Sequence, residues 1–543
     1  MSDRRGHDGT GRRGEPGRPE RDAGGRGRPE GGGSGARRDT QGRERNRGGR
    51  GPRQFSGQAP SQRSRAADPA RLVAFEVLRA VSRDDAYANL VMPQSIRRHR
   101  LDRRDAAFAT ELAYGALRGQ GTYDAILALN VDRPLSQLDP AVLDVLRLGA
   151  HQLLAMRVPP HAALNQTVAL TRAVVGAGPS SLVNAVLRRV SGKTADEWLA
   201  ELAAAQPDPT ERDALAHAHP AWIVRALRQS LAAHGRSPEE ITELLDADNA
   251  APVVNLVALP GLGHLEEALE AGAQPGELVE DSALSGGGDL GRLPAVREGT
   301  LRIQDVGSQL VARAVAAAPV HPGGQAGPAD ASGTGAPAER WLDLCAGPGG
   351  KAALLGALAA KQGATLLANE VAPHRAELVR KALAPVPGSV WEVRTGDGRE
   401  LGRESRGRFD RVIVDAPCTG LGALRRRPES RWRRSPSDLA ELGPLQRALL
   451  DSAIDAAAPG GVVGYITCSP HPAETTVVVA DALKRRHDIE LLDAGAALDA
   501  VALHPLGAGH EGTAQLWPHV HGTDAMFLAL FRKLPAATPT KET

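Results

Sequence analysis

A helical spacing of hydrophobic and polar positions extends from residue 66 to about residue 192. Leu72, Phe75 and Leu78 recur every third residue, which places them on one face of a helix. A later run begins at Asp139, a candidate N-cap that is followed by proline in the first helical turn. Several short amphipathic helices with short connections predict an all-α bundle. This pattern alone indicates no function.

A mixed pattern follows over about residues 195–300. Residues 220–235 are typical of a helix that ends at a glycine, whereas the β-branched runs 252–259 and 299–305 are typical of strands. This part predicts a small α/β unit.

Strand and helix patterns alternate from about residue 300 onward. Such alternation predicts a parallel sheet covered by helices on both faces, and near-continuous apolar strands fit that burial. Residues 321–339 interrupt this part, are rich in Gly, Pro and Ala, and predict a flexible surface insertion. The expected strands are 340–346, 364–370, 390–396, 411–416 and 461–468.

Length and composition limit the class of protein. A chain of 543 residues is too long for one core, and 41% hydrophobic with 24% charged residues suits a soluble, multidomain protein. No apolar run approaches the ~20 residues of a membrane span, and the N-terminus lacks the apolar core of a signal peptide. Three cysteines, an odd number, argue against a disulfide framework and favour a cytoplasmic protein with reduced thiols.

The charge is distributed unevenly. Residues 1–65 contain 17 Arg and no Lys against eight acidic residues, so this segment carries a net +9 while the whole chain carries only +2. The segment is also Gly-rich and has too few apolar residues to fold. It is either a weak, non-specific RNA-affinity tail or a plain disordered extension.

A glycine-rich turn, "AGPGGK", lies between the strand at 340–346 and a helix. Glycines let the backbone approach a ligand, and the helix N-terminus offers unpaired N–H groups. It is not a Walker A loop, because Cys345 and Ala352 stand where that loop needs Gly and Ser or Thr. Glu370 follows Gly350 by 20 residues at the end of the next strand, where an acid can hold ribose hydroxyls.

Two more acids, Asp397 and Asp415, come at or just after the ends of the following strands. Open α/β sheets bind ligands along that edge. A ligand with a ribose, an adenine amino group and a positive centre would use several acids, and S-adenosylmethionine is such a ligand. NAD remains a rival on these residues alone.

Two cysteines, Cys418 and Cys468, follow strands on the same edge. They could be small buried thiols, and a zinc site is disfavoured because no CxxC occurs and His471 does not complete a ligand set. A sharper reading is covalent catalysis: a thiolate that adds to C6 of cytosine makes C5 nucleophilic enough to take a methyl group. On residue chemistry alone, Cys418 after Pro417 and Cys468 are both candidates.

Three motifs carry a family resemblance: "LDLCAGPGGKA" (342–352), "VIVDAPCTGLGALRRRPESRW" (412–432) and "GYITCSPHPAET" (464–475). They resemble the RNA 5-methylcytosine methyltransferases, and the chain is most similar to the Sun/Fmu type, the small-subunit ribosomal RNA methyltransferases B. Residues 66–192 resemble the NusB fold that this type carries at its N-terminus. The resemblance covers about residues 66–534.

The resemblance implies a role for each matching residue. Cys468 would be the nucleophile on C6, and Cys418 would assist release of the methylated RNA. In three places the motifs depart from the common pattern: Glu370 replaces Asp, Thr419 replaces Ser, and the usual Asn is missing after Glu474. The S-adenosylmethionine site would be lined by Cys345, Ala346, Gly347, Pro348, Gly349, Gly350, Lys351, Glu370, Asp397 and Asp415.

Residues 424–434, the arginine segment, carry six Arg and one Trp just after Cys418. Such a run is often a solvated face, but beside a catalytic strand end we expect it to grip phosphates and stack a base. The target cytosine must leave its stack to reach a thiol, so we expect it in an exposed or loop position.

We therefore expect an S-adenosylmethionine-dependent rRNA cytosine-C5 methyltransferase, a monomer that binds small-subunit (16S) ribosomal RNA and neither a metal nor a membrane. The alternatives are the same chemistry on transfer RNA, and a non-catalytic RNA-binding or antitermination factor. The expected fold class combines an all-α NusB-like bundle, a small α/β linker domain and a C-terminal Rossmann-like class I methyltransferase. The expected parts are a tail (1–65), the NusB-like RNA-binding domain (66–195), the small domain (196–300), the methyltransferase domain (301–534, with the insertion 321–339) and a C-terminal tail (535–543).

Overall fold

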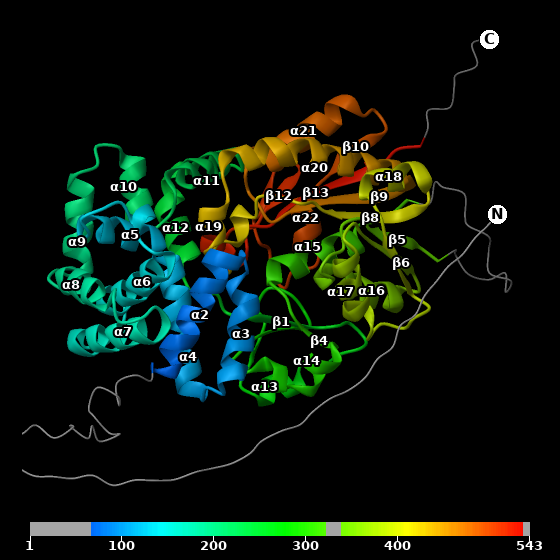
Figure 1. Cartoon of the computed structure of the whole chain (residues 1–543). Helices are drawn as coiled ribbons and strands as arrows, with labels where there is room; N and C mark the ends of the chain where they lie inside the picture. Colours follow the sequence, from blue (N-terminus) through cyan, green and yellow to red (C-terminus); the bar gives the residue numbers. More distant parts are fainter. Residues whose placement is uncertain (1–66, 322–337, 536–543) are drawn as a thin grey trace, which may run out of the picture. The chain divides into compact units, whose positions relative to one another are not determined.

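The computed structural model describes residues 67–321 and 338–535 (Figure 1). The predicted N-terminal tail lies outside the described residues, and so do nearly all of the predicted insertion and of the C-terminal tail. All of the described residues fall in one unit of mutual contacts.

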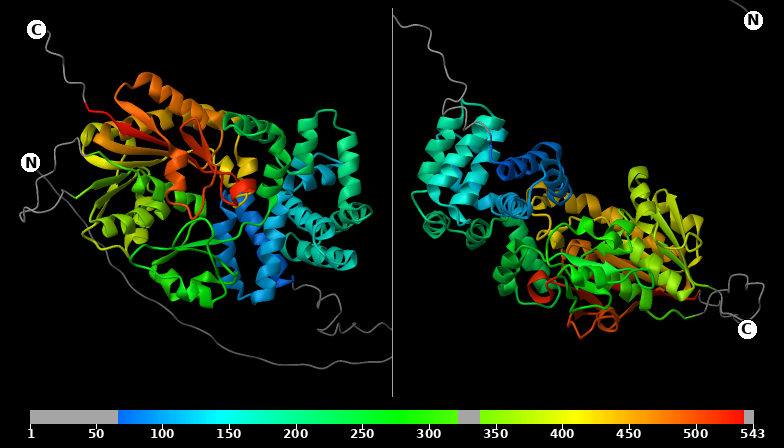
Figure 2. Two further views of the ribbon diagram at one scale, coloured as in Figure 1. Left: turned by 180° about the vertical axis from the view of Figure 1, so that it is seen from behind. Right: turned by 90° about the horizontal axis from the view of Figure 1, so that it is seen from below.

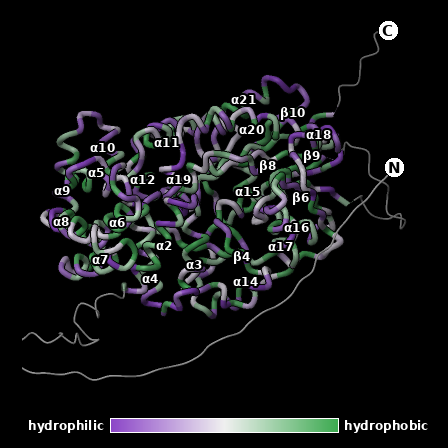
Figure 3. The backbone as a smooth tube through the Cα atoms, viewed as in Figure 1, coloured by the Kyte–Doolittle hydropathy of each residue, from purple (hydrophilic) through white to green (hydrophobic). Residues whose placement is uncertain are grey.

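The N-terminal part is a helical bundle, as the apolar spacing predicts. Asp139 caps its helix by accepting the N–H of Ala141 at 2.7 Å, so the predicted helix start is confirmed. Hydrophilic and hydrophobic residues are mixed along these helices, because each carries one buried face (Figure 3). The helices are α2 (Pro69–Asp84), α3 (Ala88–His99), α4 (Arg103–Arg118), α5 (Gln120–Leu129), α6 (Pro140–Leu154), α7 (Pro160–Val174) and α8 (Ser180–Val190).

Four further helices follow the bundle: α9 (Ala195–Ala204), α10 (Pro209–Ala216), α11 (Ala221–Ala233) and α12 (Ile241–Asn249). Trp198 and Leu202 of α9 join the bundle's own hydrophobic core. In contrast, α11 and α12 share a core with Leu421, Leu424 and Trp517 of the C-terminal part. These two helices therefore lie between the bundle and the large sheet.

A small antiparallel sheet comes next, in the strand order β2-β3-β1-β4. It contains the two strands that the sequence predicts, which pair with each other directly, Val257 opposite Arg302. Its elements are β1 (Asn255–Ala258), α13 (Glu266–Glu270), β2 (Gln274–Pro275), β3 (Ser282–Leu284), α14 (Pro294–Glu298) and β4 (Leu301–Ile303).

The C-terminal part is built on a nine-stranded sheet of order β11-β12-β13-β9-β8-β5-β6-β7, with β10 paired to β13. All five strands predicted from the sequence are present and mutually parallel. The strands are β5 (Arg340–Asp343), β6 (Thr365–Glu370), β7 (Trp391–Thr395), β8 (Phe409–Asp415), β9 (Ala457–Thr467), β10 (Ile489–Leu492), β11 (Gly509–His510), β12 (Thr513–Gln515) and β13 (Phe527–Lys533).

The expectation of a parallel sheet is wrong for the far side of β9. There β13 runs antiparallel to β9, with Phe527 opposite Thr467. The other edge of β13 is shared, because β12 pairs with its first residues and β10 with its last. The last strand of the chain, β13, therefore lies between β9 and β10. The alternation of strands and helices along the chain does not predict this antiparallel insertion.

Helices cover both faces of the large sheet, as predicted (Figures 1 and 2). One hydrophobic core joins the sheet to α15, α16, α17 and α22, and a second joins its other face to α18, α20 and α21. The covering helices are α15 (Val306–Ala317), α16 (Gly350–Gln362), α17 (Pro373–Leu383), α18 (Gly398–Glu404), α20 (Pro436–Ala456), α21 (Thr476–Arg485) and α22 (Ala494–Asp499). Within the described ranges, no helix combines the length and the apolar character that crossing a membrane requires.

Candidate active site

The predicted glycine-rich turn connects the end of β5 to the start of α16. Gly349 has a φ of +105°, in the left-handed region that favours glycine. A Cβ at Gly347 would lie 2.1 Å from Oε2 of Glu370, so a larger residue there would displace the Glu370 carboxylate. A Cβ at Gly350 would meet nothing within 4 Å. The turn thus presents open space at the N-terminal end of α16.

The three acids that the sequence singles out lie at strand ends of the same sheet, and each of them already holds a cationic partner. Glu370 is buried, accepts the Gly347 N–H at 3.1 Å and pairs with Arg375. Asp397 caps α18 and also binds the guanidinium of Arg399, with Nε 3.0 Å away. Glu370 therefore braces the glycine turn from the next strand.

One acid in this group was not singled out from the sequence. Asp343, the last residue of β5, is fully buried. Burial and the nearby Asp415 raise the pKa of Asp343 to about 7. Its position at a strand end directly before the glycine turn is the signal that could have identified it.

The ends of β8 and β9 bring two of the three cysteines together. The sulfur atoms of Cys418 and Cys468 are 3.4 Å apart. Asp415, at the end of β8, accepts a hydrogen bond from Nζ of Lys351 at 2.8 Å, and Lys351 comes from the first turn of α16. Five predicted features therefore meet at one edge of the sheet: two thiols, a lysine, a carboxylate and the glycine turn.

The two thiols differ in their electrostatics. A hydrogen bond from the Cys418 thiol, together with the positive charge of Lys351, lowers the pKa of Cys468. The same hydrogen bond, burial and the nearby Glu474 raise the pKa of Cys418. Because the two titrations are linked, the first proton leaves the pair as a whole, and the resulting thiolate is favoured on Cys468. Burial and nearby carboxylates, Asp343 first, raise the pKa of Cys345, so this third thiol is also poorly suited to ionise.

A buried carboxylate holds the two cysteine loops together, and sequence reasoning left its role open. Glu474 is fully buried and accepts the Thr419 N–H at 2.8 Å and the Thr419 hydroxyl at 2.5 Å. It also accepts from Nε2 of Gln446 at 3.1 Å. The residue next to Cys418 is thus fixed to the segment that follows Cys468.

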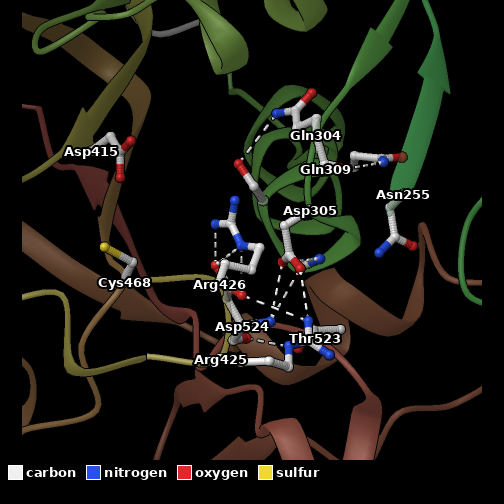
Figure 4. Close-up of polar contacts among 12 residues, drawn as sticks. Asn255, Gln304, Asp305, Gln309, Asp415, Arg425, Arg426, Cys468, Thr523 and Asp524 are labelled. Atoms are coloured by element: carbon white, nitrogen blue, oxygen red, sulfur yellow. Dashed lines mark hydrogen bonds and ion pairs between the residues drawn. The ribbon is translucent and has the colours of Figure 1, made fainter. Parts of the chain in front are cut away.

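A second polar network, built on the buried Asp305 and Asp524, flanks the thiols (Figure 4). Arg426 donates from Nε to Asp524 at 2.8 Å, and Arg425 donates to Asp305 at 3.1 Å. Burial and the neighbouring Asp524 raise the pKa of Asp305 to about 6. In Figure 4 the guanidinium of Arg426 lies on the side of this network that faces Cys468.

The predicted phosphate-gripping role of the arginine segment is wrong for most of its arginines. The side chains of Arg425 and Arg431 are buried, and Arg426 and Arg433 bond to acids and carbonyls of the protein. Trp432 keeps 38% of its surface exposed and packs on the bundle. The segment therefore mainly connects parts of the protein, since most of its arginines bond to carboxylates or carbonyls from distant parts of the chain.

Groups of three or more side chains able to hold a metal ion are absent from the described part of the chain. The donor set at the edge of the sheet instead consists of carboxylates, one ammonium group, two thiols and backbone N–H groups. An open cradle at a helix N-terminus with acids on the adjoining strands suits a nucleoside-type ligand that carries a positive centre.

Comparisons with known proteins give matches for both the N-terminal bundle and the C-terminal part. A family model described as 16S rRNA methyltransferase RsmB/F matches residues 334–532, and a NusB family model matches residues 68–192. A Mycobacterium tuberculosis protein named "Putative methyltransferase Rv1407" is 47% identical over 476 residues, which is 87% of this chain and 98% of the relative.

Ribosomal RNA small subunit methyltransferase B of Erwinia tasmaniensis is 30% identical over 401 residues, 72% of this chain and 85% of the relative. Among solved structures, the crystal structure of PH0851 has a TM-score of 0.69 at 20% identity and covers 86% of this chain and 99% of that chain. At that identity the likeness is evidence for the fold alone.

Proposed function

Because the chain belongs to the RsmB/F family of 16S rRNA methyltransferases, we propose that it methylates C5 of a cytosine in small-subunit ribosomal RNA. One observation carries the choice of chemistry. The sulfurs of Cys468 and Cys418 are 3.4 Å apart, beside the ion pair of Lys351 and Asp415 and at the sheet edge that carries the glycine turn.

S-adenosylmethionine fits the residues at this edge. The open space at Gly350 and the first N–H groups of α16 offer a place for its carboxylate, and Glu370, on the adjoining strand end, can accept from its ribose. Asp343 and Asp397 complete an acidic surround for the positively charged methyl donor. When bound, S-adenosylmethionine supplies an electrophilic methyl group for C5.

The proposed first step belongs to Cys468. Its thiolate adds to C6 of the cytosine, and electron density from the C5–C6 double bond moves toward C5 and the N3/N4 edge. Asp415 hydrogen-bonds that edge and orients the base, while Lys351 compensates the negative charge that Asp415 and the thiolate bring together.

Release completes the cycle. After C5 has received its methyl group, a water molecule takes up the C5 proton, the C5–H electron pair re-forms the C5–C6 double bond, and the C6–S bond breaks with its electron pair returning to Cys468. Cys418 assists this release. Its sulfur lies next to that of Cys468, and its raised pKa makes it a hydrogen-bond donor for the departing thiolate.

The test compares the wild-type chain with Cys468→Ala and Cys418→Ala. Each purified protein is incubated with small-subunit rRNA and S-adenosylmethionine bearing a labelled methyl group, and the products are separated on denaturing gels. We expect the wild type to methylate rRNA, Cys418→Ala to accumulate a covalent protein–RNA adduct, and Cys468→Ala to do neither. Methylation by Cys468→Ala would overturn the assignment of the nucleophile.

Parallel reactions with transfer RNA separate the proposal from the same chemistry on another substrate. Methylation of transfer RNA but not of rRNA would overturn the assignment of rRNA as the substrate. The absence of methylation and of adduct in every arm would favour a non-catalytic RNA-binding factor.

A further inference from the structure

The arginine segment, residues 424–434, connects the active-site loop to the N-terminal helical bundle (Figure 1). It ends in the short helix α19 (Ser430–Arg433), which contacts both the bundle and α12. Its contacts suggest a role for the bundle inside the catalytic cycle.

Arg431 makes the central contact. Its side chain is fully buried, although burial of an unpaired guanidinium would cost several kcal/mol. One nitrogen donates to the Arg118 carbonyl at 3.1 Å and to Oδ1 of Asn249 at 2.8 Å, with the Ala218 carbonyl at 3.4 Å. The other terminal nitrogen donates to the Asp248 carbonyl at 2.9 Å. A single side chain thus binds the end of α4, the loop before α11 and the end of α12.

Neighbours of Arg431 fasten the segment to a second place on the bundle. Glu429 accepts the N–H of Ala88, at the start of α3, at 3.0 Å. Arg433 donates to the Ala86 carbonyl at 2.6 Å. The ring of Tyr87 lies under two guanidinium groups, 4.8 Å from that of Arg427 and 5.3 Å from that of Arg433.

The other end of the segment leads directly to the thiols. The Gly422 N–H donates to the Cys468 carbonyl at 2.9 Å, and the Gly422 carbonyl accepts the N–H of Ala525 at 2.8 Å. Consecutive turns then connect Gly420 to Ala423, Ala423 to Arg426 and Arg427, and Arg427 to Ser430. A displacement of α19 would therefore be passed along a hydrogen-bonded chain of turns to the loop that carries Cys418.

The two cysteines do not depend equally on this segment. Cys468 directly follows β9, a central strand that pairs with β8 on one side and with β13 on the other. Cys418 lies in the loop that continues into the segment. Loosening of the segment would thus displace the loop that carries Cys418. It would cost Cys468 the contact with Gly422 but leave the pairing of β9 that holds Cys468 in place.

We propose that the N-terminal bundle, through Arg431, positions Cys418 for release of the methylated RNA. The inference rests on the proposed function, and it makes Arg431 a positioning residue, since it reaches the substrate only through the loop. A misplacement of about 1 Å can slow a step by about 100-fold, so a shift of the loop would stall release after the adduct has formed.

The test uses the full chain and replaces Arg431 by methionine, which keeps much of the volume and removes the donors. We expect Arg431→Met to accumulate the covalent protein–RNA adduct and to turn over at least about 10-fold more slowly, while the single-turnover rate of adduct formation stays within about twofold. A merely structural role would lower both rates together. Arg406→Met, an exposed arginine 3.2 Å from Asp455 and just before β8, at the opposite end of that strand from the thiols, should behave as the wild type.

Tyr87→Leu changes the bundle side of the contact and leaves the catalytic segment intact, so it decides the question if Arg431→Met does not fold. It should also accumulate adduct, to a smaller extent. Folded variants that turn over without adduct would overturn the inference. If Cys418→Ala forms adduct in the same experiment and these variants do not, only the positioning role fails; if no protein forms adduct, the proposed function fails.

Discussion

Glu474 offers a sharp test of how the active-site loops are held. Its carboxylate is fully buried and accepts three hydrogen bonds, two from Thr419 and one from Gln446. Replacement by alanine removes both acceptor oxygens and leaves the Thr419 N–H without its partner, whereas Gln446 still donates to the Pro417 carbonyl at 2.8 Å.

The expected cost follows from these contacts. A hydrogen bond to a charged group contributes about 1.5–3 kcal/mol, so the three bonds together set an upper limit of about 9 kcal/mol. Relief of the desolvation of a buried carboxylate offsets much of this sum. We therefore expect opening of the Cys418 loop to become easier by about 3 kcal/mol in Glu474→Ala, which corresponds to about 100-fold.

Hydrogen exchange measures this opening locally, which matters because unfolding of so large a chain is not a two-state process. The Thr419 amide should exchange about 100-fold faster in Glu474→Ala than in the wild type. In Glu474→Gln the remaining oxygen can still accept from the Thr419 N–H, and the Thr419 hydroxyl can donate instead to Ser469, whose oxygen is 3.2 Å away. This variant should stay within about fivefold of the wild type.

An exposed carboxylate serves as the matched control. Glu490 pairs with Arg532 at the surface, and Glu490→Ala should leave exchange at Thr419 unchanged. Unchanged exchange at Thr419 in Glu474→Ala would refute the reasoning, because the hydrogen bonds would then contribute nothing to the loop.

Three further predictions concern the ligand cradle, the thiol and a buried acid. Gly350→Ala adds a methyl group where no atom lies within 4 Å, so the stability of the protein should be unchanged. The affinity for S-adenosylmethionine, measured by calorimetry, should fall at least about 10-fold. Unchanged affinity would contradict the placement of the ligand. Lys351→Met removes a positive charge that lowers the pKa of Cys468. Alkylation of Cys468 by iodoacetamide, followed by mass spectrometry, should therefore require a higher pH than in the wild type. An unchanged pH dependence of alkylation would exclude this role of the lysine. Burial raises the pKa of Asp248 from 3.8 to about 7, so the native state holds a proton that the unfolded chain releases, and stability is lost as the pH rises through that interval. Asp248→Asn should reduce this loss in thermal unfolding between pH 4 and 7, whereas Asp246→Asn, at an exposed position, should retain it.

The sequence predicts the elements of this fold better than their pairing. The five parallel strands and the cap at Asp139 are local features, because apolar runs and capping residues act within a few positions. The antiparallel return of β13 depends instead on which strand reaches the edge of β9 first. That competition involves segments more than 50 residues apart, and the spacing of apolar residues carries no information about it.

The arginine segment shows that the contacts around the site, like the pairing of the strands, cannot be predicted from local sequence. Its composition is the same whether its side chains face a phosphate or the protein interior. The difference lies in carbonyl groups at Arg118, Ala218 and Asp248, more than 180 residues earlier in the chain, which accept from Arg431. Sequence reasoning could place the segment beside the catalytic loop but could not supply these partners.

The assignment of roles to the two thiols draws on both the sequence and the structure. Residue chemistry left Cys418 and Cys468 as equal candidates, and only the family resemblance ranked them. The structure adds an independent reason, because the hydrogen bond from Cys418 and the charge of Lys351 lower the pKa of Cys468, whereas the same hydrogen bond, burial and Glu474 raise the pKa of Cys418. Asp415 raises the pKa of both thiols and does not distinguish them. The proton of the pair therefore stays on Cys418, and one lysine in the first turn of α16 favours the same nucleophile that the motif implies. An enzyme that adds a thiolate in one step and expels it in the next needs such an asymmetry, since two equivalent sulfurs would compete for the same proton.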